Sequence, residues 1–183
     1  MHFVEQPNNQ RILIFDTNIF LLGINFNVIK GLVYTSPRII EEVSVARYLD
    51  KNRNILSRIN VAIEIKKLRI KSPSTFYLEQ VLAKAKETGD YIALSEADLE
   101  LIGLALELTE EINSEVILYT NDYTMENLCA QMNITYSPMI KKGIKAKKQW
   151  EVFCPVCKRK FGANCTEKYC DVCGVKLKRR EKK

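Results

Sequence analysis

Two short apolar runs, each ending abruptly at a polar turn, constrain this fold more than any other feature of the sequence. Ile12–Phe15 is followed by Asp-Thr-Asn, and Val116–Tyr119 is followed by Thr-Asn-Asp. Strands that are apolar along their whole length are typical of parallel sheets covered by helices. We therefore predict an α/β fold with a mainly parallel central sheet flanked by helices.

Strand and helix signals alternate along the rest of this region. Leu32–Thr35 has the composition of a second strand, and Ile134–Tyr136 that of a last short one. Ser36 and Pro37 supply an N-cap and a first-turn proline, and the residues SEAD at 95–98 resemble a capping box. This alternation favours a parallel sheet. We predict helices over residues 37–48, 54–70, 74–88, the apolar segment that follows SEAD, and 124–131.

Composition narrows the class of protein. Of the 183 residues, 46% are hydrophobic and 27% are charged, which is typical of a globular chain. The longest stretches without a charge, Thr17–Ile29 and Asn127–Ile140, are too short and too polar to cross a membrane. The first residues have neither the basic start nor the apolar stretch of a secretory signal. We expect a cytoplasmic protein with no membrane partner.

Histidine is nearly absent from the sequence. His2 is the only one, and it lies at the N-terminus. Catalysis by two histidines of one chain is therefore excluded, and the sequence disfavours Ser–His pairs, Cys–His pairs and His-rich catalytic zinc sites. Any hydrolytic chemistry is expected to depend on carboxylates.

Charge divides the chain near Ser137-Pro138. Residues 1–137 carry 13 Lys and Arg against 18 Asp and Glu, whereas residues 138–183 carry 15 against 4. A basic tail on an acidic body indicates a polyanionic partner, although a solvated tail gives the same pattern. A second basic stretch, over 47–71, fits either a phosphate-facing surface or an exposed amphipathic helix. We predict a main domain over 1–137, a basic linker over 138–150, a cysteine-rich module over 151–177 and a basic tail over 178–183.

Four acidic residues fall where a parallel sheet brings side chains together. Asp16 and Asp122 follow the two apolar runs closely, Glu42 lies in the helix after the second strand, and Asp98 lies in the first turn of its own helix. Sites of open α/β sheets assemble at the carboxyl ends of the strands. Crowded carboxylates repel one another unless a cation joins them. Mg²⁺ or Mn²⁺ prefers such oxygen ligands and activates water without a histidine.

Each acid also has a purely structural explanation. Asp16 and Asp122 are ordinary turn or N-cap residues, and the capping box alone accounts for Asp98. Glu42 fits a solvated helix face, where its neighbour Glu41 competes for the same role. Because Asp and Glu are common, their spacing by itself is a weak signal.

The sequence around these acids resembles a known family. IFDTNIFLLG, SPRIIEEVSV, LSEADLELIGLALEL and LYTNDYTMEN, in this order, are similar to the four acidic motifs of PIN-domain ribonucleases. Many relatives have consecutive Asp residues where this chain has Asn121-Asp122, which lowers the local negative charge and leaves the four-acid set intact. Thr120 matches the hydroxyl residue that often accompanies the last acid. The resemblance implies that catalytic Mn²⁺ or Mg²⁺ is bound by Asp16, Glu42, Asp98 and Asp122.

Four of the six cysteines form two CxxC pairs, Cys154-Pro-Val-Cys157 and Cys170-Asp-Val-Cys173, with twelve residues between them. This spacing predicts one tetrahedral structural Zn²⁺ in a zinc ribbon, with no position open for catalysis. So small a module cannot bury an adequate core, so metal binding would supply most of its folding free energy. Two disulfides are the alternative, which a cytosolic setting disfavours. We interpret Cys165 as a spare thiol and Cys129 as a core residue.

Basic and aromatic residues surround the cysteines. Cations attract phosphates and aromatic rings stack on unpaired bases, so single-stranded RNA is the expected ligand. Trp150 and Tyr169 fit either packing or stacking, whereas packing is favoured for Phe153 and Phe161. The predicted RNA-binding residues are Lys158, Arg159, Lys160, Lys168, Lys178, Arg179 and Arg180.

A PIN-like domain followed by a zinc ribbon and a basic tail resembles the Nob-type endoribonucleases of archaea and eukaryotes. The resemblance implies cleavage of single-stranded RNA at the 3′ end of small-subunit ribosomal RNA during precursor maturation. The implied partners are that precursor, the pre-small ribosomal subunit and other assembly factors. Three alternatives stay open: a toxin-type PIN ribonuclease acting on transfer or messenger RNA, a DNA-directed flap-type nuclease, and a non-catalytic RNA-binding assembly factor.

Overall fold

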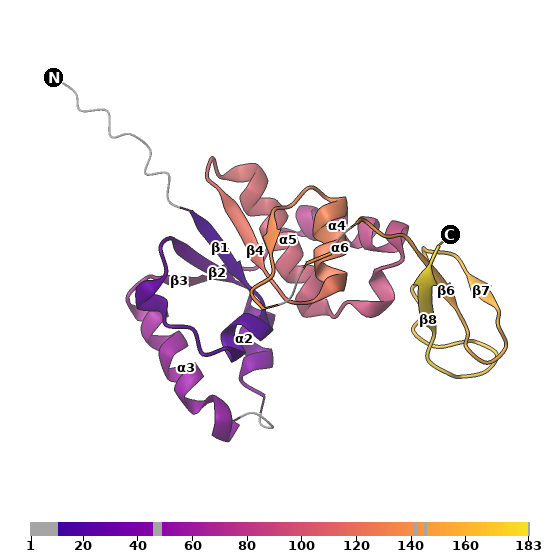
Figure 1. The fold of residues 1–183 in the computed structure, drawn as a ribbon, viewed down its shortest axis with the longest axis horizontal. Helices are drawn as coiled ribbons and strands as arrows, with labels where there is room; N and C mark the ends of the chain where they lie inside the picture. Colours follow the sequence, from indigo (N-terminus) through magenta and orange to yellow (C-terminus); the bar gives the residue numbers. More distant parts are fainter. Residues whose placement is uncertain (1–10, 46–48, 141–142, 145, 183) are drawn as a thin grey trace.

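A five-stranded parallel sheet forms the centre of the main domain (Figure 1). The computed structural model describes residues 11–45, 49–140, 143–144 and 146–182. The strands follow the order β3-β2-β1-β4-β5, with Phe15 of β1 opposite Tyr119 of β4. The sheet consists of β1 (Ile12–Phe15), β2 (Leu32–Thr35), β3 (Leu68–Ile70), β4 (Val116–Tyr119) and β5 (Tyr136–Ser137).

This strand order places the switch point of the sheet between β1 and β4. On one side of β1 the chain proceeds through β2 to β3, and on the other side it proceeds through β4 to β5. Open α/β sheets bind their ligands outside the carboxyl ends of the strands at such a point. Asp16 directly follows β1, and Asp122 lies three residues beyond the end of β4. The fold therefore delivers these two acids to the expected crevice.

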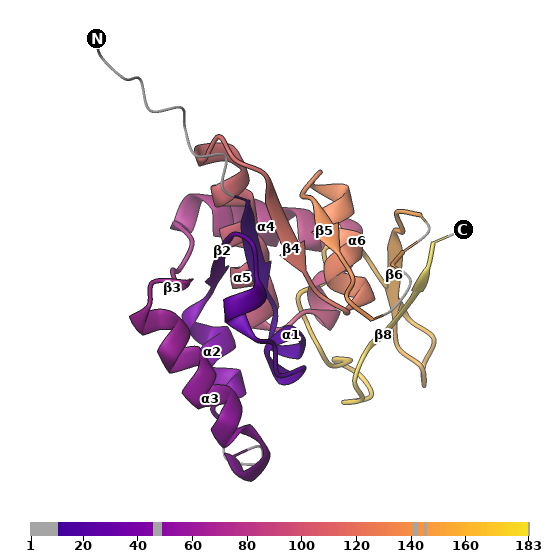
Figure 2. The same ribbon diagram turned by 60° about the vertical axis from the view of Figure 1, so that its left-hand side comes forward.

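Helices flank the sheet, and Figure 2 shows α4 and α5 behind the strands. The α/β class predicted above, with its mainly parallel sheet, is confirmed. The helices are α1 (Thr17–Leu21), α2 (Pro37–Val43), α3 (Leu49–Glu64), α4 (Thr75–Thr88), α5 (Glu96–Glu111) and α6 (Tyr123–Gln131), with short 3₁₀ turns η1 (Phe26–Val28) and η3 (Tyr91–Ala93).

Helix α5 is buried on nearly all sides, as its apolar sequence requires. It begins with the predicted capping box, in which Ser95 Oγ accepts from the Asp98 N–H and Asp98 Oδ2 accepts from the Ser95 N–H. Its buried Glu107 is paired with Lys71, which lies next to β3. Polar contacts thus fix the start of α5 and connect its second half to the segment after β3, while packing places it against β4.

Three predicted boundaries differ from the structure. The predicted helix over 54–70 is wrong at its end, because α3 stops at Glu64, Lys66 has a positive φ of 57°, and β3 follows. The helix predicted over 37–48 ends at Val43, and residues 46–48 lie outside the described ranges. The last strand occupies Tyr136–Ser137 rather than Ile134–Tyr136.

The cysteine-rich module is built on a second sheet of three antiparallel strands, in the order β7-β6-β8. These are β6 (Trp150–Phe153), β7 (Lys160–Phe161) and β8 (Lys178–Glu181). Strand β8 lies in the segment that we assigned to the basic tail, and β6 starts at the last residue assigned to the linker. The buried core of this ribbon contains two cysteines, Cys154 and Cys170, and two aliphatic residues, Val152 and Leu177. A core so small fits a module that depends on a metal.

The ribbon contacts the main domain along a seam formed by the end of α4, the helix α6 and the strands β6 and β8 (Figure 1). Gly89, which ends α4 with a φ of 76°, allows the closest approach, because a Cβ atom there would lie 2.7 Å from the backbone oxygen of Trp150. The side chain of Asn127 hydrogen-bonds both the N–H and the carbonyl of Lys148. In the described ranges no helix is long and apolar enough to cross a membrane.

Candidate active site

Asp16 is the most enclosed of the four predicted acids, with 3% of its surface exposed. Its Oδ2 atom accepts hydrogen bonds from Thr120 Oγ1 at 2.9 Å and from Asn18 Nδ2 at 3.3 Å. The pKa of Asp16 is raised from 3.8 to about 6: burial is the largest cause, the bond from Thr120 opposes it, and the nearby Asp98 carboxylate adds to the rise. Asp16 is thus held at the end of β1 in a setting that disfavours its own charge.

The hydroxyl of Thr120 connects two of the acids. It donates to Asp16 and accepts from the backbone N–H of Asp122 at 3.1 Å. Asp122 in turn caps α6, because its Oδ1 accepts from the Thr124 N–H at 2.6 Å. One fully buried hydroxyl therefore fixes Asp16 relative to the start of the helix that carries Asp122.

Glu42 reaches the same region from α2. Its Oε2 atom accepts from Thr17 Oγ1 at 2.6 Å, and Thr17 is the residue after Asp16. Glu42 is half-buried, whereas its neighbour Glu41 is exposed. Of these two glutamates, the structure brings Glu42 to the other acids.

Asp98 serves the capping box and also lies among the other acids. Burial is the largest cause of its raised pKa, and the carboxylates of Asp122 and Glu42 raise it further. The carboxylate of Asp98 also raises the pKa of Asp16. The structural explanation of Asp98 therefore does not exclude a functional one, and electrostatic effects connect Asp98 with the other three predicted acids.

The chemistry of this donor set fits a hard divalent cation. Carboxylate oxygens are the ligands that Mg²⁺ and Mn²⁺ prefer, and a cation would relieve the repulsion that raises the pKa values of Asp16 and Asp98. The acids are near one another but are not in mutual contact. Within the described ranges, the cysteine cluster alone has ligand atoms that all lie within 4.8 Å of one another.

The second predicted centre consists of Cys154, Cys157, Cys170 and Cys173, whose sulfur atoms meet within that distance. Burial opposes ionisation of Cys154, yet bonds from the backbone N–H groups of Cys157 and Val156 give a net lowering of its pKa. Bonds with the sulfur of Cys157 and burial raise the pKa of Cys173 to about 12 instead, and a metal ion would relieve the repulsion between neighbouring thiolates. Four sulfur ligands in one cluster fit a tetrahedral zinc ion.

The two remaining cysteines lie outside this cluster. The sulfur of Cys165 contacts the carbonyl of Glu167 at 3.6 Å. Cys129 is fully buried in α6, and burial raises its pKa strongly. Its interpretation as a core residue is confirmed.

The predicted RNA-binding residues divide into three groups. The side chain of Arg179 alone turns into the seam, where Nη1 lies 2.6 Å from Asp90 Oδ1. Its charge therefore acts inside the protein, which its place in a basic run did not indicate. Three others pair with acids of the ribbon, namely Arg159 with Asp171, and Lys160 and Arg180 with Glu151. The remaining three, Lys158, Lys168 and Lys178, are exposed lysines.

Sequence patterns did not single out Thr17 and Asn18, which hydrogen-bond the acids, or Asp90, which pairs with Arg179 at the seam. Thr17 and Asn18 follow Asp16 directly, so a motif centred on that acid could have included them. Nothing near Asp90 in the sequence signals its partner, which lies 89 positions away.

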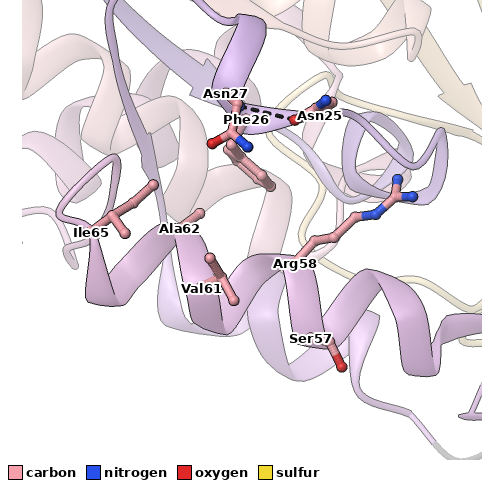
Figure 3. A pocket seen from close by; sticks show the side chains of 8 residues that line it. All are labelled: Asn25, Phe26, Asn27, Ser57, Arg58, Val61, Ala62 and Ile65. Atoms are coloured by element: carbon pink, nitrogen blue, oxygen red, sulfur yellow. Dashed lines mark hydrogen bonds between the residues drawn. The ribbon is translucent and has the colours of Figure 1, made fainter.

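A groove on another part of the main domain is unsuited to a cation. It has a volume of about 320 Å³ and lies between η1 and the second half of α3 (Figure 3). Asn25, Phe26 and Val61 are among its lining residues, and none of the eight is acidic. This groove therefore does not compete with the acidic cluster as a candidate cation site.

Comparison with known proteins agrees with the α/β fold described above. The family model described as the PIN domain of ribonuclease matches residues 13–108, from β1 through most of α5. The chain belongs to the PIN-domain ribonucleases. The matched range contains Asp16, Glu42 and Asp98, and Asp122 lies beyond it. The protein is accordingly an endoribonuclease.

Individual PIN-domain relatives are archaeal. Endoribonuclease Nob1 of Pyrococcus abyssi is 31% identical over 166 residues, 91% of each chain. Endoribonuclease Nob1 of Methanocaldococcus jannaschii is 28% identical over 170 residues, 93% of this chain and 78% of that protein. Ribonuclease VapC3 of Aeropyrum pernix is 30% identical over 128 residues, 70% of this chain and 86% of that one. The resemblance to Nob-type endoribonucleases is confirmed.

Proposed function

We propose that this PIN-domain protein cleaves single-stranded RNA with a divalent cation held by Asp16, Glu42, Asp98 and Asp122. The observation that carries the proposal is the pair of hydroxyl bridges: Thr120 connects Asp16 with the backbone of Asp122, and Thr17 holds Glu42. A cluster of acids ordered by hydroxyl groups is expected for a metal site, where the groups behind the ligands set their orientation.

Each residue has a definite task in this proposal. Asp16, Asp98 and Asp122 are the ligands, and Glu42 completes the set or orients the attacking water. Bound Mn²⁺ or Mg²⁺ supplies Lewis acidity toward a phosphoryl oxygen and lowers the pKa of water. Thr120 keeps the Oδ2 atom of Asp16 in place, and Thr17 does the same for Oε2 of Glu42.

The ribbon grips the RNA in the same proposal. Cys154, Cys157, Cys170 and Cys173 hold one Zn²⁺ that maintains the fold of the ribbon. The exposed side chains of Lys158, Lys168 and Lys178 present positive charge to phosphates. Because β6 and β8 pack along the seam, the ribbon has a fixed relation to the acids.

The 3′ end of small-subunit ribosomal RNA is the proposed cleavage region. Support comes from the relatives named Nob1, which are similar to this chain over 91% and 93% of its length. The proposed partners are the ribosomal RNA precursor, the pre-small subunit and other assembly factors. These partners imply action in the cytoplasm.

The decisive experiment incubates the full chain with a precursor RNA spanning the small-subunit 3′ end, with Mn²⁺, with Mg²⁺ and with chelator. Mapping of the ends should show one metal-dependent cut. Asp16→Asn and Glu42→Gln should abolish cleavage while RNA affinity and zinc content stay close to wild type. Glu41→Gln is the matched control and should cleave normally. Cleavage that persists in Asp16→Asn, or in chelator, would overturn the metal mechanism.

A second substrate class is favoured by one observation. The VapC3 ribonuclease of Aeropyrum pernix is 30% identical to this chain, so transfer or messenger RNA is the competing target. The same assay with transfer RNA and messenger RNA fragments separates the two. Faster cleavage of either than of the precursor would favour the toxin-type function.

A further inference from the structure

A cavity of about 650 Å³ lies at the seam. Tyr123 and Asn127 of α6 line it from the main domain, and Trp150 of β6 and Glu181 of β8 line it from the ribbon. Lys148, just before β6, also faces it. The cavity is therefore formed jointly by the nuclease domain and the zinc ribbon, and neither part would form it alone.

Tyr123 connects this cavity to the acidic site. It directly follows Asp122 in the chain, and half of its surface is exposed. A planar group bound in the cavity against this ring would lie near the start of α6, the helix that Asp122 caps. An exposed aromatic ring in such a position is the platform that single-stranded nucleic acids use.

The opposite wall is aromatic and has both signs of charge. Lys148 Nζ lies 5.8 Å from the centre of the Trp150 ring and 2.7 Å from Glu181 Oε2. Arg179, which is anchored by Asp90, lies 4.4 Å over the same ring and holds it in position. The wall thus offers hydrogen-bond donors from an ammonium group beside acceptors from a carboxylate.

These features select a nucleobase rather than a phosphate. A phosphate would be repelled by Glu181, and the charge of Lys148 is already balanced by that carboxylate. The edge of an unpaired base carries donors and acceptors side by side, which Glu181 and Lys148 can satisfy together. A base within a duplex does not expose that edge.

We propose that the cavity binds one base of single-stranded RNA against Tyr123, in the nucleotides adjacent to the phosphodiester that is cut. The proposal rests on the proposed function, because it takes RNA as the substrate. It makes Tyr123 a substrate-binding residue, and it makes Lys148, Trp150 and Glu181 the wall of a base-binding subsite shared by the two parts of the protein.

The test uses a built-in probe, since Trp150 is the only tryptophan in the sequence. Short single-stranded RNA is titrated into the full, zinc-loaded chain without added Mn²⁺ or Mg²⁺, and fluorescence and affinity are recorded. RNA should change the Trp150 emission, whereas a duplex of the same sequence should not. Tyr123→Ala should lower affinity roughly 5- to 150-fold, and Tyr123→Phe should restore it.

Phe76→Ala is the matched control, because Phe76 is 64% exposed on the far end of α4 and lies outside the cavity. It should bind RNA like wild type. In a series of RNAs, each with one base removed at a different position, one RNA should bind wild type more weakly than the intact RNA does. Tyr123→Ala should bind that RNA and the intact RNA with equal affinity. Equal affinities of Tyr123→Ala and Phe76→Ala, in variants of unchanged unfolding midpoint, would overturn the proposal.

The design separates this inference from the function on which it rests. Base binding that depends on Tyr123, in a protein that never cuts RNA with any metal, would refute the proposed function and leave the subsite standing. Metal-dependent cutting with no loss of RNA affinity in Tyr123→Ala would support the proposed function and refute the subsite.

Discussion

The guanidinium of Arg179 lies 2.6 Å from the carboxylate of Asp90, a residue with no exposed surface. The pair crosses the seam, because Arg179 belongs to β8 and Asp90 follows α4. Arg179 also donates to Thr124 Oγ1 at 2.6 Å, in the first turn of α6. The ribbon is therefore attached to the helix that begins beside Asp122.

Asp90→Asn should destabilise the protein strongly. It leaves the charge of Arg179, whose side chain is 19% exposed, without its partner. Loss of one member of a buried ion pair costs up to about 3–5 kcal/mol of unfolding free energy. Burial, which raises the pKa of Asp90, offsets part of this loss, and denaturant titration would measure the net change. Glu115→Gln breaks the exposed pair with Arg11 and should cost less than about 1 kcal/mol. Similar losses in the two variants would contradict a structural role for the seam pair.

Asp16→Asn should stabilise the metal-free protein near neutral pH. Asp16 ionises near 3.8 when unfolded and at about 6 when folded, so the folded state binds the extra proton between these values. Ionised Asp16 lowers the free energy of unfolding. This loss is absent below about pH 4, grows as pH rises, and reaches its full size of about 3 kcal/mol above about pH 6. Chemical denaturation of both proteins at pH 4 and pH 7 checks this. A lower stability of Asp16→Asn than of wild type at pH 7 would count against the prediction.

Thr120→Val should weaken metal binding while keeping the shape of the side chain. The variant removes the bond to Asp16 and the acceptor for the Asp122 N–H. Loss of a group that orients a ligand typically lowers metal affinity 10- to 100-fold. Calorimetric titration with Mn²⁺ is the measurement. Thr109→Val removes a hydroxyl that bonds only to its own helix, and it should bind Mn²⁺ like wild type.

Removal of zinc should unfold the ribbon. Its buried core has only four residues, and two of them are cysteines of the cluster. Cys154→Ser should lower the zinc content below one per chain and shift the Trp150 emission, because Trp150 begins β6. Cys165→Ser is the control, since this sulfur lies outside the cluster. An unchanged zinc content in Cys154→Ser would disprove the four-sulfur site.

Strongly patterned elements were predictable from the sequence. The boundaries of β1, β2 and β4 match the predicted runs to the residue, because strands enclosed by helices must be apolar throughout. The capping box of α5 formed as predicted, since its hydrogen bonds are local.

Edge and long-range features were not predictable. In β3 only Leu68 is buried, so this strand has no apolar pattern and resembles the end of a basic helix. Strand β8 reads as a basic tail because its register comes from pairing with β6. The motifs point to the four acids, whose role as a metal site stays a prediction. The task of Arg179 depends on a buried partner distant in sequence, and no local pattern encodes such a contact.

The bond between Thr120 and Asp16 joins positions 104 residues apart, which has a consequence during synthesis. A growing polypeptide emerges N-terminus first, so three of the four acids leave the translating ribosome before the strand that orders the first of them. Truncated products that end before Val116 lack β4 and Thr120 altogether. Such products also lack Asp122, so an unfinished copy cannot assemble the four-acid cluster.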